Sequence, residues 1–428
     1  MTTIAVKYQT KLIQQVLSTD FPDVFHLISF VSQQDSNYRK RISRNAPTGI
    51  KKAFERVCLE YQLHKEDELF VIIINGLKQC LKSYISQEHP FSKHLKDCIE
   101  IVYVPNHEER DVKITRYELL FFFALSFFHI EWNDYYDENG KEIINPRIAD
   151  ISFFQISQNF AVGTERLVCF YNYIFYVLLH PEIQTEVVTF SRRFIAEPYN
   201  FLSDESELKH YKDVQGGLEL SDCKVHIDFA NKRMIYQIWP SITQEELLFS
   251  IRPELTMSTM FFAPMESDEV IFMSNTIRLC SSTGYGESFE CTGLLPKSEQ
   301  MTNRVILAID SCVSLCFGKT AIDRDLNKAL VGFVKTEGSI ATGRWGCGAF
   351  FNDPLLKFLQ QVMVFVVSKK DGEFHWFDSK EFERFDALLQ KLIDKKYRVC
   401  DLYKLLIQFD DKNSDSFEQY ITSIIDKK

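Results

Sequence analysis

Glycine is scarce in this chain, which has only 16 glycines among 428 residues. Many phosphate-binding loops depend on glycine, because a residue without a Cβ adopts positive φ readily and lets the backbone approach the ligand closely. The scarcity limits the places where a loop of this kind can occur.

Paired cysteine motifs are also missing. The 11 cysteines are odd in number, and no two of them form a Cys-x-x-Cys pair. Neither a zinc ribbon nor a disulfide framework is therefore indicated, and we expect no metal site and no cofactor. This cysteine usage is typical of a reducing compartment, so an intracellular location, nuclear or cytoplasmic, is expected.

Long runs of basic residues and long runs of hydrophobic residues are missing as well. The net charge is −10 and no long Lys/Arg run occurs, which argues against a general nucleic-acid-binding surface. The most hydrophobic run, residues 119–130, is shorter than the roughly 20 residues that span a bilayer, so we expect a buried helix and no membrane segment. The first residues lack the apolar core of a signal peptide.

What the chain does contain is a large supply of core residues, with 45% hydrophobic residues, 37 Phe and 18 Tyr. Apolar residues at helical spacing predict a mainly helical accessory region over residues 1–180. From residue 181 to residue 428, strands alternate with helices, which indicates an α/β domain. The predicted helices are 51–63, 65–84, 119–130, 165–179, 323–334, 354–368, 380–395 and 401–406, and the predicted strands are 186–190, 225–229, 269–273 and 304–309, with a polar loop at 203–217.

The most informative stretch is residues 225–255, which predicts a strand, a loop and a helix. Val225, Ile227 and Phe229 alternate with His226 and Asp228, the pattern of a half-buried strand. A loop follows from residue 231 to residue 240.

The helix after this loop has a clear start. Thr243 and Glu246 stand at the spacing of a capping box, and Pro253 ends the apolar stripe. Gln244, Glu245 and Glu246 therefore occupy the first helical turn, where negative charge complements the helix dipole. Taken alone, the two glutamates indicate a helix cap.

Several motifs place this stretch in a wider pattern. Asp-Phe-Ala-Asn at 228–231, Gln-Glu-Glu at 244–246 and Arg-Pro-Glu-Leu at 252–255 are followed by Thr-Gly-Tyr-Gly-Glu at 283–287, Ala-Ile-Asp at 308–310, Ala-Thr-Gly-Arg-Trp-Gly-Cys-Gly-Ala-Phe at 341–350 and Val-Cys-Asp-Leu-Tyr-Lys-Leu-Leu at 399–406. Together and in this order they resemble the poly(ADP-ribose) glycohydrolase family. The resemblance implies a macrodomain-like mixed sheet between helices at 181–428, and hydrolysis of ribose–ribose O-glycosidic bonds without a metal.

The resemblance also implies roles for individual residues. Glu246 would be the general acid/base, which protonates the departing ribose oxygen. Glu245 would hold ribose hydroxyls, which Gln244 and Asn231 would orient. Tyr285 matches a tyrosine of the family's ligand pocket, although packing in the core is an equally good interpretation.

Further positions match less closely. Gly346 and Gly348 keep half of the diphosphate loop, and Arg344 would donate to a phosphate. Glu219 lies near the position of an acid that contacts adenine. Phe377 matches a ring that stacks on adenine, and a core role competes with that interpretation.

Two departures set this chain apart from the pattern. Active members have three consecutive glycines between the two motifs, whereas residues 232–243 contain none, so Ile235, Tyr236 and Gln237 would fill the space intended for ligand. In addition, Phe351 and Asn352 replace glycines, and Arg344 replaces an asparagine.

The departures define three functional hypotheses. The first is a protein that recognises ADP-ribose or its polymer with weak or absent hydrolysis, because a misplacement of about 1 Å can cost on the order of a hundredfold in rate. The second is an active glycohydrolase that uses Glu246, with specificity set by Tyr236, Trp239 and Arg344. The third is a structural module that binds a protein partner, which the sequence does not identify.

Overall fold

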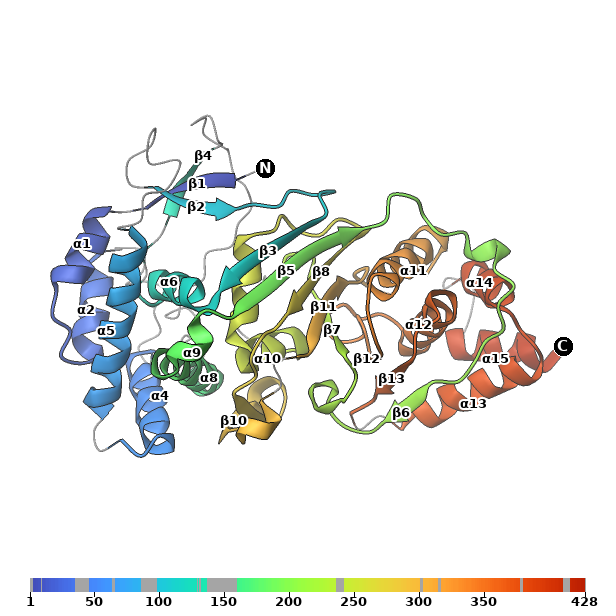
Figure 1. Ribbon diagram of the computed structural model, residues 1–428. Helices are drawn as coiled ribbons and strands as arrows, with labels where there is room; N and C mark the ends of the chain where they lie inside the picture. Colours follow the sequence, from blue (N-terminus) through green and yellow to red (C-terminus); the bar gives the residue numbers. More distant parts are fainter. Residues whose placement is uncertain are drawn as a thin grey trace.

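The computed structural model describes residues 3–8, 10–34, 46–63, 66–85, 98–128, 130, 132–136, 160–235, 242–300, 303–314, 317–377, 380–410 and 416–427. A large mixed sheet lies between two groups of helices (Figure 1). From one edge to the other, its eight described strands are β3 (Arg110–Thr115), β5 (Val187–Phe194), β8 (Glu269–Ser274), β11 (Val305–Asp310), β7 (Val225–Ala230), β12 (Ile340–Gly343), β13 (Gly372–His375) and β6 (Lys212–Val214).

The two halves of this sheet differ in strand direction. The pairings β3–β5, β5–β8 and β8–β11 are all antiparallel. From β11 through β7, β12 and β13 to β6, every pairing is parallel. The carboxyl ends of these parallel strands therefore lie along one edge, where the loops that follow them meet. The predicted fold class, a mixed sheet between helices, is confirmed.

Helices from the C-terminal part of the chain cover one face of the sheet. Their apolar side chains form one core with sheet residues such as Ile227, Leu307 and Phe374. Figure 1 shows these helices on the right, in orange and red. They are α11 (Lys319–Val334), α12 (Pro354–Ser368), α13 (Glu381–Asp394), α14 (Val399–Gln408) and α15 (Phe417–Lys427).

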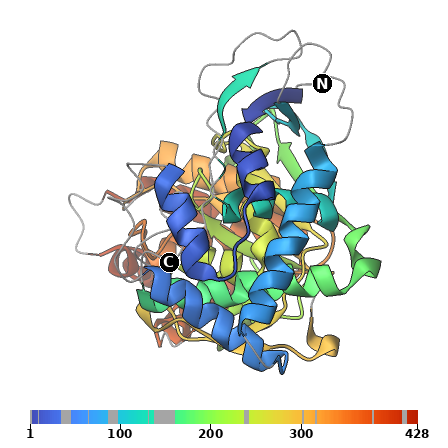
Figure 2. The same ribbon diagram turned by 90° about the vertical axis from the view of Figure 1, so that its left-hand side faces the viewer.

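A second group of helices covers the other face and shares a separate core with it. The inner layer consists of α6 (Arg116–Phe127), α8 (Phe160–Leu179), α10 (Gln244–Ile251) and the 3-10 helix η4 (Pro253–Met260). The outer layer, in front in Figure 2, consists of α1 (Thr10–Ser18), α2 (Val24–Gln34), α4 (Ala46–Glu60) and α5 (Glu66–Ile85). None of the described helices combines the length and the apolar character needed to cross a membrane.

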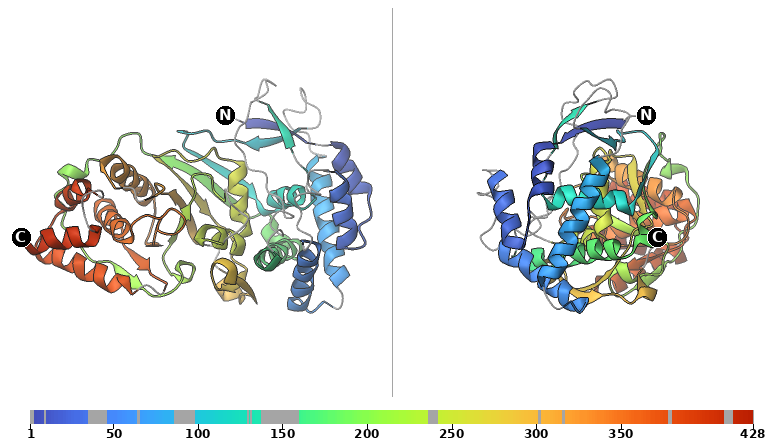
Figure 3. Two further views of the ribbon diagram at one scale, coloured as in Figure 1. Left: turned by 180° about the vertical axis from the view of Figure 1, so that it is seen from behind. Right: turned by 60° about the vertical axis from the view of Figure 1, so that its left-hand side comes forward.

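Short elements complete the described chain. A small sheet has the strand order β2 (Cys98–Val102), β1 (Thr3–Tyr8) and β4 (Trp132–Tyr136). A hairpin of β9 (Cys280–Thr283) and β10 (Glu290–Leu294) lies below α10 in the rear view of Figure 3. The remaining elements are α9 (Pro181–Gln184), η2 (Phe201–Ser203), η3 (Leu218–Leu220), η5 (Gly286–Ser288) and η6 (Lys297–Glu299).

The structure confirms the predicted helices and the four predicted strands, with shifts at their ends. Two predictions are wrong. β7 is buried almost throughout and not half buried, because helices cover both faces of the sheet. Residues 203–217, predicted as a loop, include β6, which the sheet pairs with β13. The short strands β12 and β13 escaped the sequence analysis.

The N-terminal part of the chain is joined closely to the sheet. β3 lies within residues 1–180 and pairs along its whole length with β5. Residues 1–180 also contain the strands of the small sheet, so they are not purely helical. The proposed division of the chain at residue 180 stays a prediction.

α6 connects the N-terminal part to the sheet through a buried ion pair. Its start is a complete capping box, in which Thr115 Oγ1 accepts from Glu118 N–H at 3.2 Å and the Glu118 carboxylate accepts from Thr115 N–H at 2.7 Å. In the first turn, Arg116 Nε donates to Glu254 of η4 at 2.8 Å, and both side chains are fully buried. Glu254 also accepts from Tyr173 of α8 at 2.9 Å and from Ile277 N–H at 2.7 Å.

Removal of this buried charge should destabilise both parts of the chain together. We expect Glu254→Gln to lower the free energy of unfolding by about 3–5 kcal/mol, because the Arg116 charge loses its buried partner. The matched control is Glu186→Gln, since Glu186 contacts the same guanidinium from a half-exposed position and should change stability by less than about 1 kcal/mol. Denaturant unfolding measures both variants, and equal losses would contradict the expectation.

Candidate functional site

The candidate site lies where the parallel strands end. Asn231 follows β7 and leads, through residues 232–243, to α10. The loop that carries Arg344, Gly346 and Gly348 follows β12, and Phe377 follows β13. All these segments leave the same edge of the sheet, where open α/β sheets bind their ligands.

The start of α10 is fastened to the end of β7 by Gln244. The Gln244 side chain accepts from Phe229 N–H at 2.8 Å and donates to the Ile227 carbonyl at 3.0 Å. Both ends of its amide are therefore used by the backbone of β7. The geometry makes Gln244 a positioning residue for the helix, whereas the sequence analysis expects it to orient ribose hydroxyls.

Glu245 is buried and holds the first part of the loop. One carboxylate oxygen accepts from Ile235 N–H at 2.8 Å and the other from Asn231 N–H at 3.3 Å. Asn231 Oδ1 in turn accepts from Arg233 N–H at 3.0 Å, which closes the turn. The side chains of Glu245 and Asn231 thus shape the backbone that follows β7.

Ile235 adopts a backbone conformation in this loop that glycine would adopt more easily. Its φ is +50°, in the left-handed region that a β-branched residue adopts only with strain. The bond to Glu245 and burial of the Ile235 side chain in the core hold it there. The predicted contributions of Tyr236, Gln237 and Trp239 fall on residues 236–241, outside the described residues.

Glu246 is buried at the first turn of α10, where the predicted capping box is present. One of its carboxylate oxygens accepts from Thr243 N–H at 2.9 Å and also from the Thr243 hydroxyl. Glu246 lies close enough to Asp228, Glu245 and Arg166 for their charges to interact. The helix-cap interpretation of Glu246 is therefore confirmed, and the cap lies inside a group of charged side chains.

Two further members of this group, Asp228 and Arg166, are not among the site residues predicted from the sequence. Asp228 lies on β7 with no exposed surface, and neither of its oxygens has a hydrogen-bond partner among the described residues. Arg166 lies on α8 and donates from Nε to Ser250 of α10 at 3.0 Å. The strand pattern contains Asp228 but does not show that helices bury it, and nothing in the sequence brings Arg166 to α10.

Burial controls the protonation of this group. It raises the pKa of Asp228 well above its usual range, and the charge of Glu246 adds to the effect. It raises the pKa of Glu245 in the same way, with Asp228 and Glu246 contributing and the bonds from Ile235 and Asn231 opposing. Burial lowers the pKa of Arg166 to about 10, while the charge of Glu246 acts in the opposite direction. The enclosure thus favours the protonated form of Asp228 and Glu245, which is the form that a general acid requires.

Tyr285 joins the same group from the loop of the β9–β10 hairpin. Gly286 N–H donates to the Ile242 carbonyl at 3.0 Å, which holds this loop beside the start of α10. Gly284 has φ +73°, and a Cβ there would lie 1.9 Å from the Ser288 carbonyl oxygen, so the turn requires glycine. Partial burial of its side chain raises the pKa of Tyr285, and the Glu246 charge adds to this.

An aromatic pair extends from Tyr285 along the edge of the sheet. The Tyr285 ring meets Phe377 edge to face, with 6.1 Å between ring centroids, and both residues are substantially exposed. Glu219 lies in η3, where its carbonyl accepts from Arg278 at 3.0 Å. The structure therefore makes Phe377 a surface residue, and a core role for it is wrong.

The loop after β12 is closed by side chains. Gly346 has φ +72°, and a Cβ there would lie 2.1 Å from Ser311 Oγ. The Asn352 amide donates to the carbonyls of Cys312, at 2.7 Å, and Gly346, at 3.1 Å, and so joins this loop to the one after β11. Phe351 is exposed with φ +55°. Gly346 thus serves packing in this loop, whereas Gly348 faces open space.

Arg344 keeps its charge at the surface. Its side chain is 42% exposed and lies 3.8 Å from the Glu381 carboxylate, a long ion pair that water screens. A guanidinium in this setting can rotate towards a phosphate and donate two hydrogen bonds to it.

The structure brings the predicted residues together in two neighbouring groups. Asn231, Gln244, Glu245, Glu246 and Tyr285 surround the start of α10. Arg344, Gly346 and Gly348 lie on the next loop along the same edge. The first group can supply an acid, and the second can supply donors to an anion.

Several curated proteins similar to this chain come from one family. Residues 203–384 match the family described as Poly (ADP-ribose) glycohydrolase (PARG), Macro domain fold. The chain is 30% identical over 195 residues to poly(ADP-ribose) glycohydrolase 1 of Caenorhabditis elegans, which is 40% of this chain and 25% of that protein. It is 23% identical over 247 residues to probable poly(ADP-ribose) glycohydrolase 2 of Arabidopsis thaliana, which is 45% of this chain and 47% of that protein.

A further curated relative is also similar to this chain over part of its length. The chain is 25% identical over 229 residues to poly(ADP-ribose) glycohydrolase 2 of Caenorhabditis elegans, which is 47% of this chain and 47% of that protein. The chain thus spans between a quarter and about half of the length of these curated relatives.

The raised pKa of Asp228 has a measurable consequence. Between about pH 4, where an unfolded carboxyl titrates, and its raised folded pKa, the folded protein binds more protons than the unfolded chain. Stability should therefore fall as pH rises through this window. Asp228→Asn imitates the protonated acid, so we expect the variant to equal wild type near pH 4 and to be more stable at pH 8. Its advantage should grow by about 1.4 kcal/mol for each pH unit within the window.

A control of opposite sign is available at Asp204. Burial acts against it, yet hydrogen bonds from Tyr199 and Ser206 lower the pKa of Asp204. Asp204→Asn should therefore lose stability relative to wild type at neutral pH and recover it as the pH falls below about 4. Unfolding curves across the pH range measure both variants. A wild type and an Asp228→Asn variant that stay equally stable at every pH would refute the assignment.

Proposed function

The chain belongs to the poly(ADP-ribose) glycohydrolase family, and on that premise we propose that it recognises ADP-ribose or its polymer, with hydrolysis weak or absent. Recognition would take place at the carboxyl edge of the sheet, between the start of α10 and the loop after β12. The ligand is an anion that carries ribose hydroxyls, and Arg344 lies on the loop after β12, the parallel neighbour of the strand that leads to α10.

The hydrogen bonds of Glu245 and Glu246 are the observation that supports weak or absent hydrolysis. The carboxylates that should act on ribose already accept hydrogen bonds from the protein itself. Glu245 accepts from two backbone N–H groups, and Glu246 accepts from Thr243. A general acid needs its proton within hydrogen-bond reach of the leaving oxygen, and a ribose would have to compete with these internal donors.

The loop after β12 would hold the diphosphate. It favours binding through a side chain more than through backbone N–H groups. Asn352 closes the loop after β12, and Gly346 packs against Ser311. Arg344 remains as an exposed cation on that loop. Because the chain carries a net charge of −10, a local donor of this kind has to supply the attraction for a polyanion.

A second candidate, an active glycohydrolase, is favoured by the buried acid group. Burial raises the pKa values of Asp228 and Glu245, and the charge of Glu246 interacts with both of them and with Arg166. Carboxyl groups that cannot all ionise together are a usual source of a general acid near neutral pH. In this reaction Glu246 would protonate the ribose oxygen as the glycosidic bond breaks.

Incubation with labelled poly(ADP-ribose), at catalytic and at stoichiometric protein concentration, separates the two candidates. We expect little or no release of ADP-ribose by wild type and unchanged binding by Glu246→Gln in calorimetry. The matched control is Glu118→Gln, which makes the same carboxylate-to-amide change at the same capping-box position of α6, away from the site. Release by wild type and by Glu118→Gln that falls by about 10²–10⁴-fold in Glu246→Gln would instead establish the active enzyme.

The recognition part has its own test at Arg344. We expect Arg344→Ala to weaken ADP-ribose binding about tenfold, because one charge-assisted contact to phosphate is lost. Glu381→Gln removes the carboxylate beside Arg344 and should bind at least as tightly as wild type. Calorimetry with ADP-ribose measures both. No heat with ADP-ribose or its polymer for wild type would refute recognition, and unchanged affinity in Arg344→Ala would remove Arg344 from the site.

A further inference from the structure

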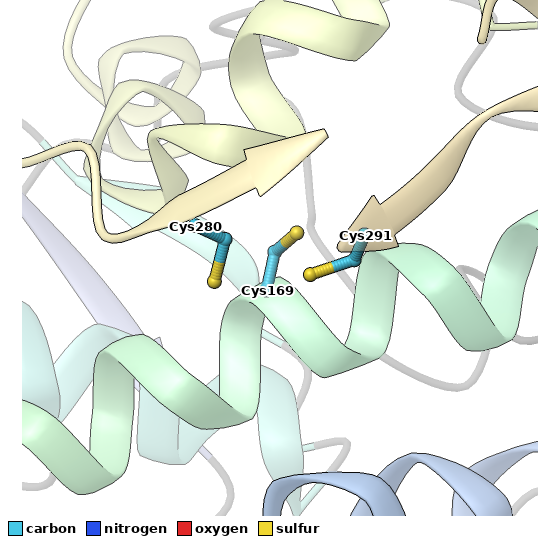
Figure 4. Close-up of side chains that lie close together, drawn as sticks. All are labelled: Cys169, Cys280 and Cys291. Atoms are coloured by element: carbon cyan, nitrogen blue, oxygen red, sulfur yellow. The ribbon is translucent and has the colours of Figure 1, made fainter. Parts of the chain in front are cut away.

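Three cysteine side chains from separate elements meet behind the candidate site. Cys169 lies on α8, Cys280 begins β9 and Cys291 lies on β10. Their sulfur atoms all lie within 4.8 Å of one another, and all three residues are buried. Figure 4 shows Cys169 on its helix between the two strands that carry Cys280 and Cys291.

The hairpin register explains how two of these thiols share one face. Cys280 pairs with Leu294 and Cys291 pairs with Ser282, so the two cysteines are diagonal neighbours on the same side of the hairpin. A register shift between Cys291 and Gly293 turns the strand locally. Cys169 reaches this face from α8, and the three sulfur atoms gather where the hairpin meets the helix.

The backbone of Cys291 is held on both sides by charged groups. Its N–H donates to Glu165 of α8 at 2.9 Å. Its carbonyl accepts from Arg56 of α4, and Arg56 also pairs with Glu165. Two helices therefore fix the position of this thiol relative to Cys169 on α8, as sites that bind a metal require of their ligands.

Two further charged side chains face the cluster. Glu60 of α4 lies close enough to Cys280 and Cys291 for their charges to interact, and its buried Oε2 has no hydrogen-bond partner among the described residues. The buried Arg278 donates to the Cys280 carbonyl at 3.3 Å, and its charge interacts with Cys169 and Cys280. The Glu60 carboxylate lies outside the group of mutually close ligand atoms and would have to turn towards the sulfur atoms to become a fourth ligand. The Arg278 guanidinium is near enough to balance negative charge.

We propose that Cys169, Cys280 and Cys291 bind a zinc ion as thiolates, with the Glu60 carboxylate as the fourth ligand. Zinc prefers four tetrahedral ligands of this kind, with Zn–S distances of about 2.3 Å, which places the sulfur atoms about 3.8 Å apart. The three sulfur atoms, which lie within 4.8 Å of one another, need only a small contraction to reach that spacing. Each thiol releases its proton as the metal binds, and no oxidation or reduction takes place.

The site would act as a clamp and not as a catalyst. It joins α8 to the β9–β10 hairpin, and the loop of that hairpin carries Tyr285 to the start of α10. Ligands from α4, from α8 and from both strands of the hairpin would fasten the hairpin at its base. The zinc proposal does not depend on the proposed function, because metal content is measured without any ADP-ribose.

Two other arrangements of the same thiols are outcomes of the test. Buried cysteines can pack as small apolar side chains without a metal. Two of the three can also form a disulfide, which removes two electrons and two protons and so needs an external oxidant.

The test is the zinc content of the full chain, purified under reducing conditions from zinc-supplemented medium. We expect about one zinc ion per chain in wild type, by elemental mass spectrometry. Cys280→Ala and Cys291→Ala should each retain at least about tenfold less zinc, and Glu60→Gln should bind it more weakly. The matched control is Cys80→Ala, which removes a buried cysteine of α5 outside the cluster and should keep the zinc.

Measurements on wild type keep the proposal testable where a variant does not fold. Cobalt that replaces zinc should show a sulfur-to-cobalt charge-transfer band, and removal of zinc by a chelator should lower the Tm and expose three further thiols to a thiol reagent. Wild type that takes up neither zinc nor cobalt when supplied in excess would overturn the proposal. So would equal zinc loss in Cys80→Ala and Cys291→Ala, or a disulfide between two of the three cysteines under the same reducing conditions.

Discussion

The hydrogen bonds between Gln244 and the end of β7 are the interaction on which the site depends. They fix the start of α10 at the carboxyl edge of the parallel strands, because one side-chain amide satisfies both a donor and an acceptor of the β7 backbone. Glu245 and Glu246 follow Gln244 directly, so their positions are set by the same contact. The loop after β7 and the Tyr285 turn then pack against a helix end that is already in place.

Fixing α10 there has an electrostatic cost. Three carboxyl groups become buried beside one another, with Arg166 as a buried cation nearby. Burial of several like charges destabilises a fold unless some of them stay protonated. The bonds from Asn231 and Ile235 to Glu245 offset part of this cost, and they also draw the carboxylate towards the loop. The same contacts that stabilise the acid group therefore limit how freely it can reach a ribose.

α8 connects this site to the rest of the chain. Arg166 and Cys169 lie one turn apart on it, and Tyr173 reaches the buried pair of Arg116 and Glu254. One helix thus contacts the acid group, the cysteine cluster and the link to α6. α8 also contributes side chains to the core that the helices before residue 180 share with one face of the sheet.

The sequence by itself determined the features of the fold that arise within a single helix or strand. Spacing along the chain predicted the helices, the central strands and the capping box at Thr243, because those patterns repeat with the geometry of a single element. Family motifs placed the site at α10. Only the tertiary structure decided the burial of Asp228, the approach of Arg166 and the meeting of Cys169, Cys280 and Cys291. These depend on contacts between residues far apart in the chain, and no local spacing records which elements will pack together.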